Sequence, residues 1–231
     1  NVDGGIYLSA NRGFNLAGDF IGIVIDGASV TSTGTGDIEL DGTSGDAANN
    51  QHAVVLKNNA LLETTGTGRN LLFGVSRGTG GSNNDGLQIL SGSDVRSNTG
   101  VIVLEFLEGS GANSEAIVLA DDAGTSISTT SGAITLKGDI LSLGENNSSI
   151  TAGNGNSVLL QPKTSGTEIN LGASSNSQFG LSDAQLDRIT AAGIVIGGSS
   201  TGTITITDAI TRSAATDLIF VAGAGNDLVF S

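Results

Sequence analysis

Apolar residues in this chain come in short runs that are separated by Gly, Asp, Ser and Thr. Between residues 21 and 45 the runs are Ile23–Ile25, a single Val30, and Ile38–Leu40. Each run is a few residues long and is bounded by residues that favour turns, which is the pattern of short β-strands. No helical periodicity fits this segment. It therefore predicts three short strands.

The same pattern returns at a nearly constant distance along the chain. One series of apolar positions consists of Val30, Leu62, Val95 and Ile127, and a second consists of Ile38, Leu71, Ile102 and Ile134. Members of both series recur at about 32 residues, a period typical of repeat architectures. Such a repeat indicates a solenoid in which each strand pairs in parallel with its equivalent in the next coil. The predicted fold is all-β: a right-handed parallel β-helix with three strands per coil and roughly seven coils.

Composition agrees with a narrow, regularly packed solenoid. The chain has 36 Gly, one Pro and no Cys among 231 residues, and 38% of its residues are hydrophobic. Small aliphatic side chains suit a stacked interior, and Gly suits tight corners. We expect a single β-solenoid domain over residues 1–231, with regular coils in 1–172, a helical insertion in 173–193 and terminal coils in 194–231.

One segment departs from the strand pattern. Ser182 is followed three positions later by Gln185, which together form a capping box at a helix start. Gly193 stands where a helix would end. The sequence therefore predicts one short helix near 183–192, as a decoration on the solenoid.

Three polar loops fall at the same phase of the repeat: Thr43–Gln51, Val75–Asp85 and Glu108–Glu115. Insertions at one phase lie on one edge of a solenoid, where a binding surface is most often found. The middle loop, rich in Gly and Asn, is predicted to be the most flexible stretch. We expect its Thr79–Asn84 segment to lie outside the repeating strands, so that its deletion leaves the fold intact.

The charge balance limits the choice of partner. The chain has 9 Lys and Arg against 23 Asp and Glu, a formal net charge of −14. Such a surface repels nucleic acid and anionic lipid, so neither is an expected partner. No stretch approaches the length of apolar sequence that a membrane-spanning helix needs, and membrane insertion is not expected. The absence of Cys is compatible with bacterial export.

Parallel β-helices include polysaccharide lyases and hydrolases, which need clustered carboxylates and usually aromatic sugar platforms. Asp121 and Asp122 are adjacent, but neighbouring strand residues point to opposite faces, and in a turn both would be solvated. His52, the only histidine, lies in a polar loop without a nucleophile motif, and Tyr7 is the only tyrosine. We therefore expect no catalytic residues and no enzymatic activity.

Metal binding has weak support in the sequence. The run Gly223–Leu228 resembles one copy of a Gly-rich calcium nonapeptide, in which consecutive copies share each ion. A Gly-rich turn between strands at Leu218 and Leu228 explains it better. Asp85 and Asp94 could attract Ca²⁺ loosely, but no ligand spacing defines a site. We expect no metal site and no cofactor.

The run LSDAQLDRITAAGIVIGGSSTGTITITDAI, at positions 181–210, resembles interior segments of filamentous-haemagglutinin-like large bacterial exoproteins. The close resemblance is confined to this run, and the Gly-rich coils before it are similar in general style. It implies export across the outer membrane and a role as an adhesin or surface fibre. The Asn-Pro motifs of that family's secretion domain are absent from this chain.

These observations favour a structural or adhesive segment of a secreted bacterial surface protein, extracellular or on the cell surface. The rod would have loops on one edge available to a ligand on a host or neighbouring cell. The alternative is a polysaccharide-active β-helix enzyme. Strand-like sequence at both ends, without an evident cap or signal peptide, predicts continuation in a longer chain or end-to-end self-association.

Overall fold

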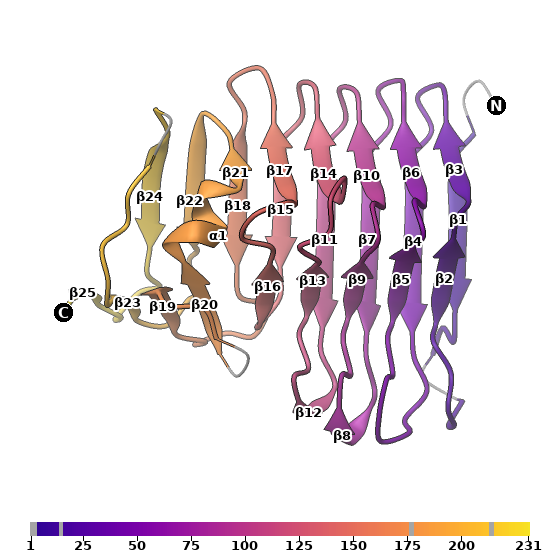
Figure 1. The fold of residues 1–231 in the computed structure, drawn as a ribbon, viewed down its shortest axis with the longest axis horizontal. Helices are drawn as coiled ribbons and strands as arrows, with labels where there is room; N and C mark the ends of the chain where they lie inside the picture. The colour runs from indigo at the N-terminus through magenta and orange to yellow at the C-terminus, as the bar shows by residue number, and fades with distance from the viewer. Residues whose placement is uncertain (1–3, 14–15, 176–177, 213–214) are drawn as a thin grey trace.

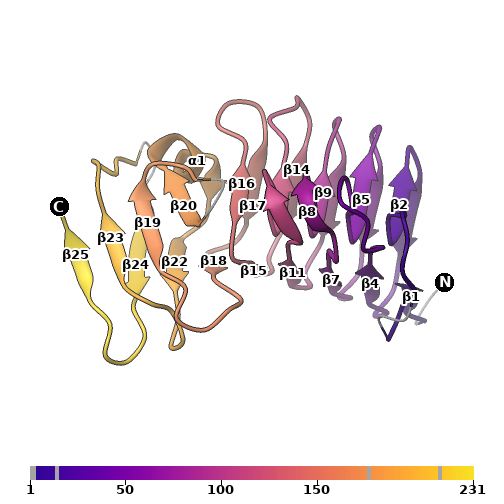
Figure 2. The same ribbon diagram turned by 90° about the horizontal axis from the view of Figure 1, so that it is seen from below.

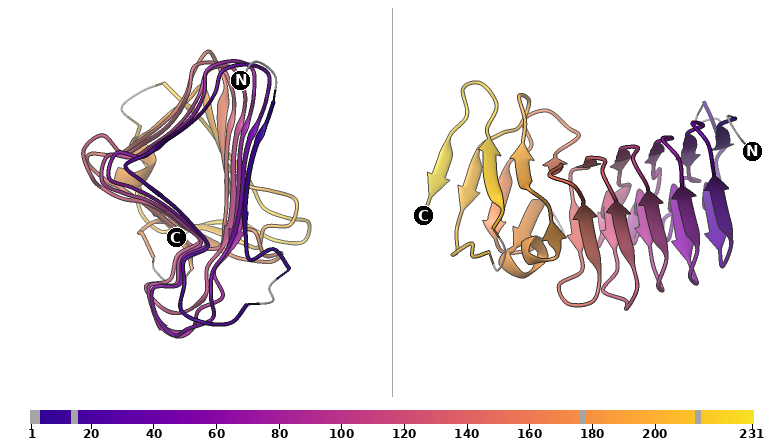
Figure 3. Two further views of the ribbon diagram at one scale, coloured as in Figure 1. Left: turned by 90° about the vertical axis from the view of Figure 1, so that its right-hand side faces the viewer. Right: turned by 90° about the horizontal axis from the view of Figure 1, so that it is seen from above.

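The computed structural model describes residues 4–13, 16–175, 178–212 and 215–231. The chain winds into a right-handed parallel β-helix whose coils stack along one axis, as Figure 1 shows. Viewed along that axis, the coils superimpose as a three-sided tube (Figure 3). Every strand pairing between described residues is parallel. The predicted fold class is confirmed.

Three sheets form the sides of the regular coils, and each receives one strand per coil. Sheet A contains β1 (Ile6–Ala10), β4 (Ile38–Thr43), β7 (Asn70–Val75), β11 (Ile102–Leu107), β15 (Ile134–Lys137), β18 (Ser157–Gln161), β22 (Gly193–Gly197) and β24 (Asp217–Val221). Sheet B contains β2 (Ile23–Asp26), β5 (Val54–Lys57), β9 (Leu87–Ile89), β13 (Ile117–Leu119) and β16 (Leu141–Leu143). Sheet C contains β3 (Ser29–Ser32), β6 (Leu61–Thr64), β10 (Asp94–Ser97), β14 (Ser126–Thr129), β17 (Ser149–Ala152) and β21 (Ile189–Thr190).

The interior consists of aliphatic side chains stacked one coil apart. In sheet C, Leu62 is in register with both Val30 and Val95, and Val95 is in register with Ile127. This is the predicted inward series. Leu62, Val95 and Ile127 are fully buried, while Val30 in the first coil is partly buried. Stacking of this kind removes apolar surface from water along the whole rod, at about 25 cal/mol per Å².

The second predicted series is wrong at one position. Ile38 and Ile102 are in register with Asn70, whereas Leu71 points outward from sheet A. Asn70 is fully buried, and its Nδ2 donates to the Arg96 carbonyl at 2.6 Å. The physical reason is the strict alternation of strand side chains: the pairing with β4 and β11 places Asn70, not Leu71, on the inner face.

The corner between sheets C and A is closed by glycines that stack one repeat apart: Gly36, Gly68, Gly100 and Gly132. A Cβ on Gly100 would lie 1.9 Å from the Gly68 carbonyl oxygen, and one on Gly132 would lie 2.1 Å from that of Gly100. Successive coils touch backbone to backbone here. Only glycine permits this approach.

The stacking changes after β18. A fourth sheet, E, continues near β16 and contains β20 (Phe179–Ser182), β19 (Ile169–Gly172), β23 (Ile204–Ile206) and β25 (Leu228–Phe230). Figure 2 shows these strands at the C-terminal end of the rod. β20 of sheet E lies between β16 and β19, although β20 follows β19 in the sequence. A second small sheet, D, pairs β8 (Thr79–Ser82) with β12 (Ser110–Ala112).

The predicted helix begins correctly but is too long. Helix α1 spans Asp183–Asp187, and Ser182 and Gln185 form the expected capping box. The predicted continuation to residue 192 is wrong, because Ile189 pairs with Ile150 and extends the buried ladder of sheet C. Gly193 lies in β22, not at a helix end. The helix is also no surface decoration, since its Leu186 is fully buried in the core.

Candidate functional site

Of the long loops at the corner between sheets A and B, three lie wholly within the described part of the chain. They are residues 44–53, residues 76–86, which include β8, and residues 108–116, which include β12. After β15 the same corner shortens to residues 138–140. We call these three loops together the loop ledge. They lie along the lower edge in Figure 1, at one phase of the repeat as predicted.

Backbone hydrogen bonds tie the loops of the ledge to one another. The Asn50 N–H donates to the Ser82 carbonyl at 3.1 Å, and the Asn83 N–H donates to the Ala112 carbonyl at 3.0 Å. Asn50, Asn83 and Asn113 all have left-handed backbone conformations, with φ of 57°, 56° and 49°. Asn is one of the few non-glycine residues that tolerates this region. The ledge therefore repeats the same turn in each coil.

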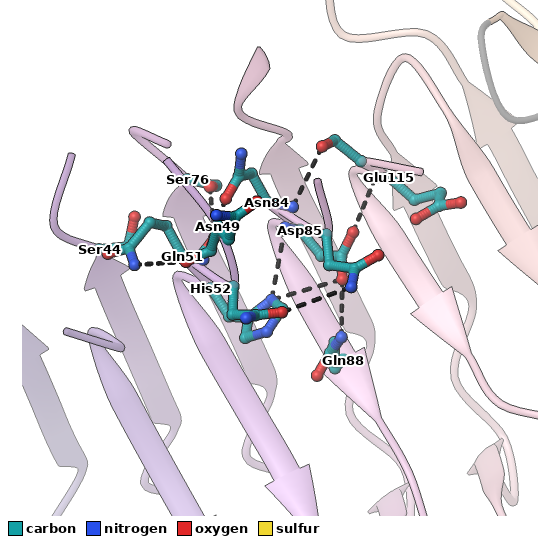
Figure 4. A network of polar contacts seen from close by, with 12 residues as sticks. Ser44, Asn49, Gln51, His52, Ser76, Asn84, Asp85, Gln88 and Glu115 are labelled. Carbon is teal, nitrogen blue, oxygen red and sulfur yellow. Dashed lines mark hydrogen bonds and ion pairs between the residues drawn. The ribbon is translucent and has the colours of Figure 1, made fainter. Parts of the chain in front are cut away.

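One buried side chain connects all three loops. The Nδ2 atom of Asn84 lies 2.9 Å from the Ala48 carbonyl, 2.7 Å from that of Gly80 and 2.7 Å from that of Ser110. Its Oδ1 accepts a hydrogen bond from the Gln51 N–H at 3.1 Å. Figure 4 shows the positions of Asn84 and Gln51.

Residues 79–84 lie outside the repeating strands of sheets A, B and C, as predicted, but they are not an unpaired loop, because they contain β8, which pairs with β12. The segment also supplies Asn84, the side chain that links the loops. Deletion of the segment would remove both the β8–β12 pairing and this link, so it is expected to destabilise the ledge.

Beside Asn84 lies a buried cluster of titratable side chains. The Nδ1 atom of His52 is 3.3 Å from Oδ2 of Asp85, and the Gln88 amide donates to the same oxygen at 2.6 Å. The other carboxylate oxygen of Asp85 accepts the Glu115 N–H at 2.8 Å. His52, Asp85 and Glu115 are only 6%, 2% and 8% exposed. The cluster thus links the residues that precede three successive strands of sheet B: β5, β9 and β13 (Figure 4).

Burial and hydrogen bonding shift the pKa values of the two acids in this cluster in opposite directions. Burial alone would raise the pKa of Asp85, but hydrogen bonds with His52 and Glu115 outweigh it and lower that pKa. Burial raises the pKa of Glu115 to about 7, and its hydrogen bond with Asp85 adds to the rise. Asp85 is therefore the ionised member of the pair, and Glu115 holds a proton up to near neutral pH.

Glu108 is a third acid with altered titration. Burial raises its pKa to about 7, and the charges of Asp139 and Asp85 add to the shift. Its Oε2 atom is buried and has no hydrogen-bond partner. Glu108 lies where the ledge ends, at the step down to the short turn of residues 138–140. A proton on this carboxyl removes the cost of a buried, uncompensated charge.

The sequence identified His52 and Asp85 separately but did not bring them together, and it missed Glu108 and Glu115. Asp85 follows His52 by about one repeat, and Glu115 follows Asp85 by nearly the same distance. Residues about one repeat apart lie in adjacent coils of a β-helix. That spacing was the signal that could have revealed the cluster.

The other candidate acids have structural roles. The Asp121 carboxylate accepts the backbone N–H groups of Asn146 and Asn147, at 2.9 and 2.6 Å, and these hydrogen bonds lower its pKa to about 2. Asp94 pairs with Arg96 at 2.5 Å and accepts a hydrogen bond from the Ser126 hydroxyl. Asp122 accepts the Ser91 N–H at 2.7 Å. Asp121, Asp94 and Asp122 each thereby connect one coil to the next.

The described residues contain no group of three or more His, Cys, Asp or Glu side chains placed to hold a metal ion. The Gly223–Leu228 run forms the turn between β24 and β25, where the Gly223 N–H donates to the Thr201 carbonyl at 2.8 Å. Tyr7 is exposed on the outer face of sheet A. Within the described part of the chain, no helix has the length and apolar character needed to cross a membrane.

Two surface hollows lie away from the ledge. A shallow polar groove of about 340 Å³ at the end of sheet C is lined by residues that include Glu63, Arg96, Asn98 and Thr130. An open apolar hollow of about 690 Å³ lies at the C-terminal end and is lined by residues that include Ile206, Leu218, Phe220 and Phe230. Phe230 is 71% exposed.

The fold defines the chain as a parallel β-helix, and the ledge is its most elaborated edge. Comparison with protein-family models, with curated protein sequences and with solved structures gives no match.

Proposed function

We propose that this chain is a structural or adhesive rod of a secreted bacterial surface protein, and that the loop ledge is its binding edge. The single observation that carries the proposal is the cross-linking of three consecutive loops by Asn84. A surface that is already ordered loses little conformational entropy when it binds a partner. Three coils of pre-ordered loops therefore suit recognition better than independent flexible loops would.

Two further features support this proposal. The net charge of −14 keeps a rod of exposed strand faces soluble and disfavours nucleic acid as a partner. The resemblance of residues 181–210 to filamentous-haemagglutinin-like exoproteins is consistent with export and with a place at the cell surface. The partner of the ledge is then a component of a host or neighbouring cell surface.

The ledge offers a matched pair of variants for a test of adhesion. The triple substitution Asn50→Gly, Asn83→Gly and Asn113→Gly removes three exposed side chains from the loop tips, while glycine keeps the left-handed backbone. The control applies the same substitution to three exposed left-handed asparagines away from the ledge: Asn58, Asn59 and Asn154.

The assay measures retention of protein-coated fluorescent beads on cultured epithelial cells. We expect beads coated with the wild type to be retained in greater number than albumin-coated beads. Retention should fall at least about fivefold for the ledge variant and should equal that of the wild type for the control variant. Equal losses in both variants would reject the ledge as the binding edge. Wild-type retention no higher than albumin would reject adhesion to these cells and leave only the structural role.

End-to-end association belongs to the same proposal. β1 and β24 are the end strands of sheet A, and both carry the repeating inward positions. Pairing β24 with β1 of a second copy would place Ile6 over Leu218 and Leu8 over Phe220, continuing both ladders. Such a contact does not close on itself and would form open filaments. Electron microscopy of the wild type and of Phe220→Asp tests it, with filaments expected only for the wild type.

A polysaccharide-active enzyme is the second candidate, and one observation favours it. The pKa values of Glu108 and Glu115 are raised to about 7, the range of a general acid. Against it, Glu115 is 8% exposed, which leaves little room for a sugar ring. Release of reducing ends from acidic and neutral polysaccharides, lost in Glu115→Gln, would support this alternative.

A further inference from the structure

The outer face of sheet A carries an apolar patch. Because side chains alternate along a strand, every second residue of β7 and β11 points outward. Five of these outward residues are apolar and only partly buried: Leu71, Phe73, Val75, Val103 and Leu107. Four of them form two pairs across the strands, with Leu71 in register with Val103 and Val75 in register with Leu107, while Phe73 is in register with Glu105. The patch is therefore apolar except at Glu105, and a partly exposed apolar area on a sheet face is typical of an interaction surface.

The patch is flanked by opposite charges along the rod. On its N-terminal side, β4 presents Glu39 and Asp41, which are in register with Leu71 and Phe73, and Asp41 also pairs with Arg12 at 3.8 Å. On its C-terminal side, Lys137 and Lys163 both approach one carboxylate, that of Glu105, at 3.7 and 3.3 Å. Two ammonium groups on one carboxylate leave an excess positive charge. With Arg12 counted against Glu39 and Asp41, and Glu105 against Lys137 and Lys163, the face has net negative charge at one end and net positive charge at the other, with the apolar residues between them.

This arrangement is self-complementary. A two-fold axis parallel to the strands and between β7 and β11 would bring the apolar patches of two copies together. The same operation places β4 of one copy over β15 of the other, so that Asp41 faces Lys137 of the second copy and Phe73 faces its Glu105. Face-to-face sheets pack about 10 Å apart, which allows side chains from both faces to interdigitate.

We propose that the outer face of sheet A packs against the same face of a second copy, with the two rods antiparallel. This contact is lateral, and so it is separate from the end-to-end contact and from the ledge. At physiological salt the Debye length is about 8 Å, so repulsion between the distant acidic surfaces is screened. The apolar patch and the two symmetric Asp41–Lys137 contacts then determine association.

The test is the dissociation constant of the full chain, measured by sedimentation velocity over a range of concentrations. Val103→Glu places a charge opposite Leu71 within the patch and is expected to weaken the dimer at least about tenfold. Ser128→Glu is the matched control, an outward substitution on sheet C, and is expected to have no effect. Thermal melting of each variant shows whether it remains folded.

A charge swap separates a specific contact from general stickiness. Asp41→Lys alone and Lys137→Glu alone should each weaken association about tenfold, since both symmetric contacts become repulsive. The double variant should recover most of the wild-type affinity. A monomeric wild type at every concentration, or a double variant no tighter than the single variants, would overturn the proposal. The bead-retention assay tests the ledge and the filament assay tests the ends, so failure of the lateral contact does not affect either result.

Discussion

Asp85 and Glu115 lie one coil apart, and the backbone N–H of Glu115 donates to Oδ1 of Asp85 at 2.8 Å. Both side chains are almost fully buried. Burial raises the pKa of Glu115 to about 7, and a hydrogen bond between the two side chains adds to this rise and lowers the pKa of Asp85, so Asp85 stays ionised while Glu115 stays protonated to near neutral pH. The side-chain hydrogen bond between these two loops of the ledge therefore requires the proton on Glu115.

Stability should fall as pH rises through the titration of Glu108 and Glu115. Both have folded pKa values of about 7 against an ordinary value of 4.5, so the folded state binds protons that the unfolded chain releases. Their contribution is complete below pH 4.5 and is lost as pH rises to 7. Allowing for solvent screening, we expect a loss on the order of 1 kcal/mol per group.

The double variant Glu108→Gln with Glu115→Gln isolates this effect, because glutamine imitates the protonated acid. Its denaturation midpoint should change less between pH 5 and pH 8 than that of the wild type. Chemical denaturation at a series of pH values measures the difference. Parallel curves for the two proteins would show that these carboxyls do not titrate in this range.

Loss of the Asn84 side chain should destabilise the ledge. Asn84→Ala leaves the Gln51 N–H and three loop carbonyls without their partner inside the protein, and we expect a cost of about 2–3 kcal/mol. The neighbouring exposed Asn83→Gly keeps its backbone conformation and should cost under about 0.5 kcal/mol. Urea denaturation compares the two, and equal costs would contradict the cross-linking role of Asn84.

The glycine corner should not accept even a methyl group. In Gly100→Ala the new Cβ would lie 1.9 Å from the Gly68 carbonyl oxygen, so adjacent coils must separate, at a cost of about 2–3 kcal/mol. Gly193→Ala is the control, because its nearest atom is the flexible Ser157 hydroxyl at 3.3 Å. Thermal unfolding of both variants measures the difference, and a neutral Gly100→Ala would refute the close stacking.

The inward ladder of sheet C should reject a charge. Val95 is fully buried between Leu62 and Ile127, so Val95→Asp would bury an unpaired carboxylate and cost about 4 kcal/mol or more. Ser128→Asp introduces the same side chain on the outer face of the same sheet and should be tolerated. Cooperative melting unchanged by Val95→Asp would be incompatible with this register.

The repeat was readable from the sequence because the solenoid places equivalent residues at nearly equal spacing, as Val30, Leu62, Val95 and Ile127 do. What the spacing of apolar residues could not show was a polar residue in an inward position. Hydrophobicity favours Leu71 for the inward position, whereas the strand register places Asn70 there. Ile189 was assigned to a helix because a local capping box says nothing about the strand one coil away. Tertiary pairing decided that case.

The buried cluster was harder to foresee for a related reason. His52, Asp85 and Glu115 lie in polar loops of unequal length, and loop residues usually remain on the surface. Their burial follows from the loops stacking on one another, which hydrophobic patterning does not encode. The repeat distance pairs these residues, but the desolvation that raises the pKa of Glu115 depends on the packed structure.

The proposed binding edge requires a loop ledge that is fixed before any partner binds. Amide hydrogen exchange by NMR tests this directly, because it measures the protection of each N–H group. We predict that the N–H groups of Asn50 and Asn83, which bond to the adjacent loop, exchange as slowly as those in β7 and β11. If the ledge amides exchanged at the rate of an unstructured chain while the amides of β7 and β11 stayed protected, the proposed pre-ordered binding edge would be contradicted.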